Sequence, residues 1–337
     1  MKTAVFSTKP YDEHFLTAAN QSLGAAHRLE FFEERLNYHT AALVEGHQAV
    51  CAFVNDVLDA PTIDRLHERG VRFIALRCAG FNQVDLRHAA ALGVRVAHVP
   101  AYSPHAVAEF ALTLVLALNR KIHRAYNRVR DGNFSIEGLV GFDLHGKTVG
   151  LLGTGKIGLV FAGILSGFGV RLLGYDPFHN PAFTKHGGRY VTLEELLSQS
   201  DIISLHCPLT PDTFHIINAQ SIARMKRGVM LVNTSRGALV DTVAVIDGLK
   251  SGQIGYLGLD VYEQEADVFY ENLSESIIQD DILQRLISFP NVLVTSHQAY
   301  FTDTALNNIA ETTIRNLTVF ENGGALDNEI TADRIHT

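Results

Sequence analysis

Cysteine is scarce in this sequence, and long apolar runs are missing. Cys51, Cys78 and Cys207 stand far apart and form neither a C-x-x-C pair nor a disulfide framework, which is typical of proteins in reducing compartments. The longest apolar stretch, Phe110–Leu118, has about half the length of a membrane-spanning helix, so we expect it to be a buried helix. Polar residues follow Met1 too soon for the apolar core of a signal peptide. We therefore expect a cytoplasmic protein without a membrane partner.

Net positive charge is also missing. The chain carries 28 Lys and Arg residues against 36 Asp and Glu residues, a formal charge of −8, which argues against a protein dedicated to nucleic acid. One basic stretch, Arg120–Arg130, could bind nucleic acid, but we favour a solvated helix face or a subunit contact. The motifs H-E-x-x-H, G-x-S-x-G, the EF-hand loop and the P-loop are absent, so we expect no catalytic metal and no acyl-transfer serine.

What the sequence does contain is an alternation of short apolar strands and amphipathic helices. Its 337 residues are enough for two domains, and the alternation predicts an α/β protein with parallel sheets and right-handed crossovers. One helix is predicted to begin at Pro104, with Ser103 as its N-cap, and to continue to Arg130 between the two halves. The predicted strands are Thr3–Phe6, Arg28–Phe31, Ala49–Val54, Phe73–Leu76, Arg95–His98, Thr148–Gly153, Arg171–Tyr175, Ile202–His206, Val229–Asn233, Gly255–Val261 and Val292–Thr295.

A glycine-rich turn follows the first strand of the second half and opens a helix. It reads Gly153-Thr154-Gly155-Lys156-Ile157-Gly158, a G-x-G-x-x-G motif in the context that favours dinucleotide binding over chance. The first glycine permits the turn, the second lets the backbone approach a diphosphate, and the third lets helix pack on strand. Asp176 ends the next strand, where a carboxylate can bind ribose hydroxyls and repel a 2′-phosphate, so NAD is favoured over NADP. The alternative is an α/β domain with a glycine turn and no ligand.

Reactive side chains follow several strands of the second half. Because ligands bind outside the carboxyl ends of strands in such sheets, these residues are candidates for a common site. Arg236 could grip a substrate carboxylate with its planar guanidinium, or it could form a structural salt bridge. His297 ends the last strand, and a carboxylate bonded to it would favour the imidazolium, which can protonate a ketone oxygen. Glu265 and Glu263 are both placed to supply that carboxylate, and their spacing does not choose between them.

Six segments resemble the D-2-hydroxyacid dehydrogenase family, and within it the bacterial fermentative NAD-dependent D-lactate dehydrogenases. The likeness runs from Ser7 to about Glu329, nearly the whole chain. The segments are Ala75–Asn82 (ALRCAGFN), Val99–Pro104 (VPAYSP), Ser204–Thr210 (SLHCPLT), Asn233–Ala238 (NTSRGA), Leu259–Glu265 (LDVYEQE) and His297–Tyr300 (HQAY).

The resemblance implies a fold of two doubly wound parallel-sheet domains. A Rossmann NAD domain, residues 102–299, would be inserted in a flavodoxin-like substrate domain formed by residues 1–101 and by a returning C-terminal segment, 300–337. It also implies a homodimer built through the NAD domains, or a homotetramer.

The resemblance further implies the roles of individual residues. It makes Arg236, Glu265 and His297 the catalytic residues and so selects Glu265 over Glu263. For the substrate it implies Cys78, Ala79, Gly80, Tyr102, Arg236, His297 and Tyr300. For NAD it implies Gly153, Gly155, Lys156, Ile157, Gly158, Asp176, Cys207, Pro208, Thr213, Thr234, Ser235, Arg236 and Asp260.

The activity that these residues imply is the reversible reduction of pyruvate to D-lactate by NADH. A second hypothesis keeps the same site with another substrate, such as hydroxypyruvate, glyoxylate, a branched 2-oxoacid or phosphite. A third is an NAD-sensing protein-binding module that resembles the transcriptional corepressors of this fold. We favour an enzyme over the third hypothesis, because the corepressors usually carry flanking segments that we do not expect here, and the resemblance favours pyruvate over the other substrates.

Overall fold

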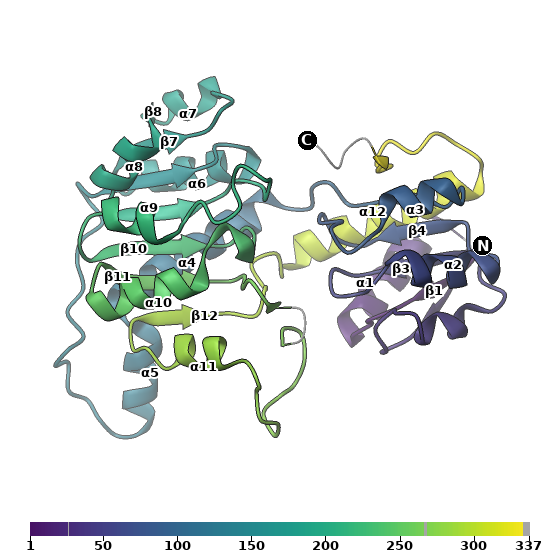
Figure 1. Cartoon of the computed structure of the whole chain (residues 1–337), viewed down its shortest axis with the longest axis horizontal. Helices are drawn as coiled ribbons and strands as arrows, with labels where there is room; N and C mark the ends of the chain where they lie inside the picture. The colour runs from purple at the N-terminus through teal and green to yellow at the C-terminus, as the bar shows by residue number, and fades with distance from the viewer. Residues whose placement is uncertain (26, 266–267, 333–337) are drawn as a thin grey trace. The chain divides into compact units, whose positions relative to one another are not determined.

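The computed structural model describes residues 1–25, 27–265 and 268–332, and the chain divides into two compact units. The first unit is Met1–Ser103 together with Phe301–Thr337, and the second is Pro104–Tyr300. Each unit has one sheet in which every pair of strands is parallel, and Figure 1 shows their elements. The α/β class with two parallel sheets is therefore confirmed.

Five strands form the sheet of the first unit, in the order β2-β1-β3-β4-β5. This is the flavodoxin-like order, as predicted. The two strands β3 and β4 are buried at every residue, because central strands of such a sheet are covered on both faces. The bounds are β1 (Lys2–Val5), β2 (Arg28–Phe31), β3 (Ala49–Ala52), β4 (Phe73–Leu76) and β5 (Arg95–Ala97).

The helices of the first unit begin at residues that satisfy their open backbone donors. Asp59 accepts a hydrogen bond from the amide of Thr62 at 3.1 Å, and Asp85 accepts one from the amide of His88 at 3.0 Å. The helices are α1 (Pro10–Ser22), η1 (Thr40–Val44), α2 (Ala60–Glu68), α3 (Leu86–Ala91) and α12 (Asp303–Glu321). The last of these, α12, is yellow in Figure 1. It comes near the end of the sequence and packs against α1 and β4 of the first unit.

The segment after α12 is bonded to the edge strand β5. The amide of Ile330 donates to the carbonyl of Val96 at 2.8 Å, and the guanidinium of Arg95 binds both carboxylate oxygens of Glu329 at 2.8 Å. The described part of the segment after α12 is therefore an integral part of the first unit.

A buried arginine connects the carboxyl ends of the strands in this unit. Arg77, directly after β4, donates from Nε to Asp12 at 3.0 Å and from Nη2 to the carbonyl of Ser7 at 2.8 Å. Its guanidinium also lies over the Phe53 ring, 4.7 Å from the centroid. The neighbouring Asp56 accepts a bond from the Ser7 hydroxyl at 2.6 Å, and burial raises the pKa of this carboxyl. These contacts fix the backbone from which the segment after β4 departs.

Seven strands form the sheet of the second unit, in the order β12-β11-β10-β9-β6-β7-β8. With β6 as the first strand, this contains the 3-2-1-4-5-6 order of a Rossmann sheet, so the predicted Rossmann fold is confirmed. The two-residue β8 was not predicted, because two residues are too few to show a pattern. The bounds are β6 (Thr148–Leu152), β7 (Arg171–Tyr175), β8 (Arg189–Tyr190), β9 (Ile202–Leu205), β10 (Val229–Asn233), β11 (Ile254–Leu259) and β12 (Val292–Val294).

Helices accompany this sheet, and α4 packs against α6, β10 and β11. Its buried residues include Leu114 and Leu118, which belong to the same apolar core as residues of β6 and β10. The helices are α4 (Pro104–Arg120), α5 (Ile122–Arg130), α6 (Lys156–Ser166), α7 (Pro181–Lys185), α8 (Leu193–Gln199), α9 (Ala219–Arg224), η2 (Gly237–Leu239), α10 (Thr242–Ser251) and α11 (Asp281–Ile287).

The prediction of one continuous helix from Pro104 to Arg130 is wrong. Lys121 adopts φ 49° and ψ 36°, a left-handed conformation that separates α4 from α5. Just before the break, the Asn119 side chain donates to the carbonyl of Phe142 at 2.7 Å and accepts from its amide at 2.8 Å. The end of α4 is thus held to the segment that leads into β6, whereas α5 buries no residue. Local helix propensity could not show this tertiary contact.

A half-buried histidine directly after β9, His206, makes the stability of the fold depend on pH. Burial lowers the pKa of His206 to about 3 from its ordinary value of 6.5, and the ring bonds the Ser204 hydroxyl at 2.9 Å. Between these two values the unfolded chain binds more protons than the folded one. The contribution of His206 to stability is therefore lost as the pH falls below 6.5.

We predict that His206→Gln reduces this loss. Between about pH 7.5 and about pH 5, the wild type should lose roughly 2 kcal/mol more unfolding free energy than the variant. Urea unfolding of both proteins at the two pH values measures the difference. Equal losses in the two proteins would contradict the assignment.

Candidate active site

The glycine turn between β6 and α6 leaves space for a ligand next to a helix start. Gly153 has φ 97°, and a Cβ there would lie 2.6 Å from the amide nitrogen of Cys207. A Cβ on Gly158 would lie 2.3 Å from the carbonyl oxygen of Gly153, so α6 packs directly on the turn. At Gly155, by contrast, a Cβ would meet no atom of the described chain within 4 Å. Gly155 is also the N-cap without a capping side chain, so the first amides of α6, including those of Lys156 and Ile157, suit a diphosphate.

Asp176, at the end of β7, is held beside this turn. Its Oδ2 accepts from the amide of Thr154 at 2.7 Å and from its hydroxyl at 3.2 Å, and its Oδ1 accepts from the amide of Phe178 at 2.8 Å. The Thr154 hydroxyl is bonded in turn to the Tyr190 hydroxyl at 2.7 Å. Each carboxylate oxygen has further acceptor capacity, which suits a ribose diol. No motif in the sequence indicates that Thr154 and Tyr190 support Asp176.

The loops after β9 and β10 support each other. The Ser235 hydroxyl donates to the carbonyl of Cys207 at 2.6 Å, and the Thr213 hydroxyl donates to the carbonyl of Pro208 at 2.7 Å. The Thr234 hydroxyl is buried and has no hydrogen-bond partner in the parts of the chain that the structure describes. Because a buried polar group without a partner is costly, this hydroxyl suits a ligand.

Arg236 leaves the end of β10 from a rigid turn. The fully buried Asn233 donates to the carbonyl of Arg236 at 2.8 Å and accepts from the amide of Ser235 at 3.0 Å. A Cβ on Gly237 would lie 2.2 Å from the Tyr262 backbone, so this loop packs tightly against the loop after β11. The guanidinium donates to the carbonyl of Ser235 at 2.7 Å and forms no ion pair with any carboxylate of the described residues. The alternative of a structural salt bridge therefore has no partner there.

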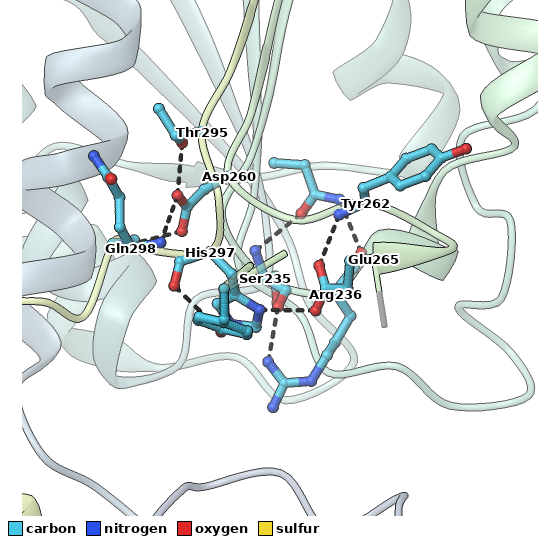
Figure 2. A network of polar contacts seen from close by, with 11 residues as sticks. Ser235, Arg236, Asp260, Tyr262, Glu265, Thr295, His297 and Gln298 are labelled. Atoms are coloured by element: carbon cyan, nitrogen blue, oxygen red, sulfur yellow. Dashed lines mark hydrogen bonds and ion pairs between the residues drawn. The ribbon is translucent and has the colours of Figure 1, made fainter. Parts of the chain in front are cut away.

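Glu265 contacts His297, as the resemblance implied. The Glu265 Oε1 atom lies 2.8 Å from Nδ1 of His297, and Oε2 accepts from the amide of Tyr262 at 2.9 Å. Glu263 instead contacts His215, with 2.7 Å between Oε1 and Nε2. Figure 2 shows the labelled Arg236 side chain in the same group as the Glu265–His297 pair. The structure thus answers the question that residue spacing left open: Glu265 is the neighbour of His297.

Asp260 holds the loop that carries His297. Its fully buried carboxylate accepts from the Thr295 hydroxyl at 2.6 Å, from the amide of Gln298 at 2.9 Å and from the amide of Ala299 at 2.8 Å. The amide of His297 donates to the carbonyl of Asp260 at 2.7 Å, and His297 has φ 55°. Figure 2 shows Asp260 in contact with Thr295 and Gln298. Sequence reasoning gave Asp260 only a cofactor role, because nothing local in the sequence links residue 260 to the loop after β12.

The loop after β4, in the first unit, presents two open backbone donors. The carbonyl of Cys78 accepts from the amide of Val99 at 3.1 Å, and the carbonyl of Ala79 lies 2.8 Å from Nδ1 of His98. The Cys78 thiol donates to the carbonyl of Gly80 at 3.2 Å. Within the described residues, the amides of Ala79 and Gly80 donate to no acceptor. A loop with satisfied carbonyls and open amides is suited to bind an anion.

The two predicted tyrosines belong to different units. Tyr102 lies in the first unit, where its carbonyl accepts from the Asn308 side chain at 2.6 Å. Tyr300 is the last residue of the second unit and is buried.

The sequence led us to expect no catalytic metal, no membrane-spanning helix and no disulfide framework. In residues 1–25, 27–265 and 268–332, no group of three or more His, Cys, Asp and Glu side chains is arranged to hold a metal ion. In the same ranges, no helix has the length and apolar character to cross a membrane. Cys51, Cys78 and Cys207 are all buried, and none of them forms a disulfide within the described residues.

Known proteins resemble this chain over nearly its full length. Residues 112–299 match the family described as D-isomer specific 2-hydroxyacid dehydrogenase, NAD binding domain. The chain is 52% identical to a D-lactate dehydrogenase of Escherichia coli (strain K12), with 98% of this chain and 100% of that protein covered. The apo-structure of D-lactate dehydrogenase from Escherichia coli has a TM-score of 0.90 at 50% identity and covers 98% of this chain and 100% of its own. A structure of the pyruvate reductase of Chlamydomonas reinhardtii has a TM-score of 0.93 at 46% identity, with coverages of 97% and 98%.

The residues matched by this family include the glycine turn with its open amides, and Asp176 at the end of β7. They also include both members of the His–Glu pair, Glu265 and His297. The chain therefore belongs to the D-isomer-specific 2-hydroxyacid dehydrogenase family and is an NAD-dependent oxidoreductase.

Proposed function

We propose that this enzyme reversibly reduces pyruvate to D-lactate with NADH. The observation that carries the proposal is the hydrogen bond between Glu265 and His297. Arg236, which has no ion-pair partner among the described residues, belongs to the same group of side chains in Figure 2. A cation for a carboxylate and a proton donor for a ketone are the two groups that a 2-oxoacid requires. The names of relatives, D-lactate dehydrogenase and pyruvate reductase, support pyruvate as the substrate.

Arg236 binds and orients the carboxylate of pyruvate in this proposal. Its guanidinium offers a planar pair of N–H donors, which match the two oxygens of a carboxylate. The open amides of Ala79 and Gly80, with Cys78 shaping their loop, supply further donors to the same group. The family resemblance is our reason for including Tyr102 and Tyr300 among the proposed substrate-binding residues.

His297 transfers the proton. Because Glu265 accepts from Nδ1, that nitrogen carries a hydrogen and Nε2 is left to face the substrate. Nε2 gives its proton to the carbonyl oxygen of pyruvate during reduction and takes it back from the hydroxyl of D-lactate in the reverse reaction. Glu265 orients the ring through both reactions.

The dinucleotide, when bound, supplies the hydride that reaches C2 of pyruvate. Of the protein groups, the amides at the start of α6 bind its diphosphate and Asp176 binds its ribose hydroxyls. The open space at Gly155 and the unpartnered Thr234 hydroxyl support this placement. The full set of NAD contacts that we propose is Gly153, Gly155, Lys156, Ile157, Gly158, Asp176, Cys207, Pro208, Thr213, Thr234, Ser235, Arg236 and Asp260.

We also propose that the enzyme is a homo-oligomer formed through α5. The side chains of Ile122, Tyr126 and Val129 recur on one face of this helix and are 59%, 60% and 51% exposed. Phe134 and Ile136 follow and are 76% and 82% exposed. An exposed apolar patch of this kind is typical of a protein interface, and a second copy of the chain is the partner that the family resemblance implies. The three buried cysteines, which form no disulfide among the described residues, support a cytoplasmic location.

A panel of 2-oxoacids with NADH tests the substrate assignment. We predict that kcat/KM is highest for pyruvate, because Arg236 and His297 serve any 2-oxoacid and the remaining pocket selects the group on C3. A higher kcat/KM for hydroxypyruvate, glyoxylate or a branched 2-oxoacid would replace pyruvate as the substrate, and so would faster oxidation of phosphite by NAD⁺ in a separate assay. Negligible turnover of every compound, together with NADH-dependent binding of peptides, would favour a protein-binding module.

The oligomer proposal predicts that charge on the α5 face separates the subunits. The double variant Ile122→Glu/Val129→Glu should shift the molar mass, measured by light scattering after size exclusion, from a dimer or tetramer toward a monomer. Ile287→Glu is the matched control, because Ile287 is 49% exposed in the same unit but lies on α11. A monomeric wild type, or a double variant with unchanged mass, would refute the role of α5.

A further inference from the structure

The peptide planes of the loop Cys78–Gly80 are anchored from the side of β5. The amide of Val99 donates to the carbonyl of Cys78, and Nδ1 of His98 bonds the carbonyl of Ala79. In a planar trans peptide the C=O and N–H bonds point in opposite directions. Each anchored carbonyl therefore turns the next amide, that of Ala79 or of Gly80, away from His98 and Val99.

His98 contributes its side chain to this arrangement. A carbonyl oxygen can only accept, so Nδ1 of His98 carries the hydrogen of the 2.8 Å bond. The residue is buried, and its ring meets the Phe81 ring edge-on at a centroid distance of 5.7 Å. The ring is thereby restricted to the orientation in which it reaches the carbonyl of Ala79.

The C-terminal segment in turn fixes the backbone of His98. The amide of His98 donates to the carbonyl of Asn328 at 3.1 Å, and its carbonyl accepts from the Asn316 side chain at 3.1 Å. The Asn328 side chain donates to Oδ1 of Asn316 at 3.0 Å. Asn316 is buried, so water does not compete for these bonds. The return of the chain to the first unit thus determines where the His98 ring lies.

We propose that His98 is a positioning residue for substrate binding. It holds the peptide between Ala79 and Gly80 so that the Gly80 amide faces the carboxylate of the 2-oxoacid. Without the bond, this peptide is free to rotate, and a rotated peptide presents a carbonyl oxygen that repels a carboxylate. The inference rests on the proposed function, in which Ala79 and Gly80 bind the carboxylate. His98 lies outside all six segments that carry the family resemblance.

Two substitutions of equal size separate the hydrogen bond from the packing. In His98→Asn, the side-chain nitrogen stands near the position of Nδ1 and retains the donor. The leucine of His98→Leu branches at the same carbon as asparagine but has no hydrogen-bond donor. For His98→Leu we expect the KM for pyruvate and the inhibition constant of oxamate to rise about tenfold, or roughly 1.4 kcal/mol. We expect kcat to change less than about threefold, because His297 and Glu265 are untouched, and the Kd for NADH to stay constant. For His98→Asn we expect both substrate constants to remain near those of the wild type.

Glu329→Gln is the matched control. It removes the ion pair with Arg95, which joins the same strand to the same C-terminal segment, and it leaves the carbonyl of Ala79 untouched. Thermal unfolding of all variants measures the loss of stability, and the KM for pyruvate should remain constant in the control. An unchanged KM in His98→Leu, an equal rise in His98→Asn or an equal rise in Glu329→Gln would overturn the role of His98 while the reductase remains established. A wild type without turnover of any 2-oxoacid would overturn the proposed function and this inference with it.

Discussion

The buried carboxylate of Asp260 is the constraint on which the candidate active site depends. It accepts three hydrogen bonds from the loop after β12, and its own carbonyl accepts the amide of His297. His297 adopts a left-handed backbone, which costs on the order of 1–3 kcal/mol for a residue other than glycine and persists only where the surroundings enforce it. The contacts of Asp260 enforce it here. They place Nδ1 of His297 next to Glu265, so this His–Glu contact is formed before any ligand binds.

The other candidate site residues are positioned in a similar way. Contacts from one loop hold a residue that stands on a neighbouring loop. Gly237 lets the loop of Arg236 press against the Tyr262 backbone, and the amide of Tyr262 binds Glu265. In the first unit, His98 and Val99 hold the carbonyls of the loop after β4. Rigid positioning of this kind favours catalysis because little reorganisation accompanies the reaction. It also makes function sensitive to residues that touch no substrate.

Much of the fold was predictable from the sequence, because strands buried on both faces leave continuous apolar runs such as Val229–Val232. The helix break at Lys121 was not predictable, since it depends on Asn119 bonding a residue far along the chain. The candidate residues at the strand ends were visible as motifs, and the resemblance chose Glu265 over Glu263. The supporting contacts of Asp260 and His98 were invisible, because a hydrogen bond between distant segments leaves no periodicity or local motif.

The most direct test of the account measures single-turnover hydride transfer, followed as NADH oxidation with saturating pyruvate, in His297→Ala. NADH affinity, titrated by fluorescence, should stay near that of the wild type, while the rate falls by about 10²–10⁴-fold because the proton donor is gone. His215→Ala is the comparison, because His215 pairs with Glu263 in a similar His–Glu contact and should retain the wild-type rate within a few-fold. A His297→Ala variant that transfers hydride at nearly the wild-type rate, or an equal loss in His215→Ala, would contradict the assignment.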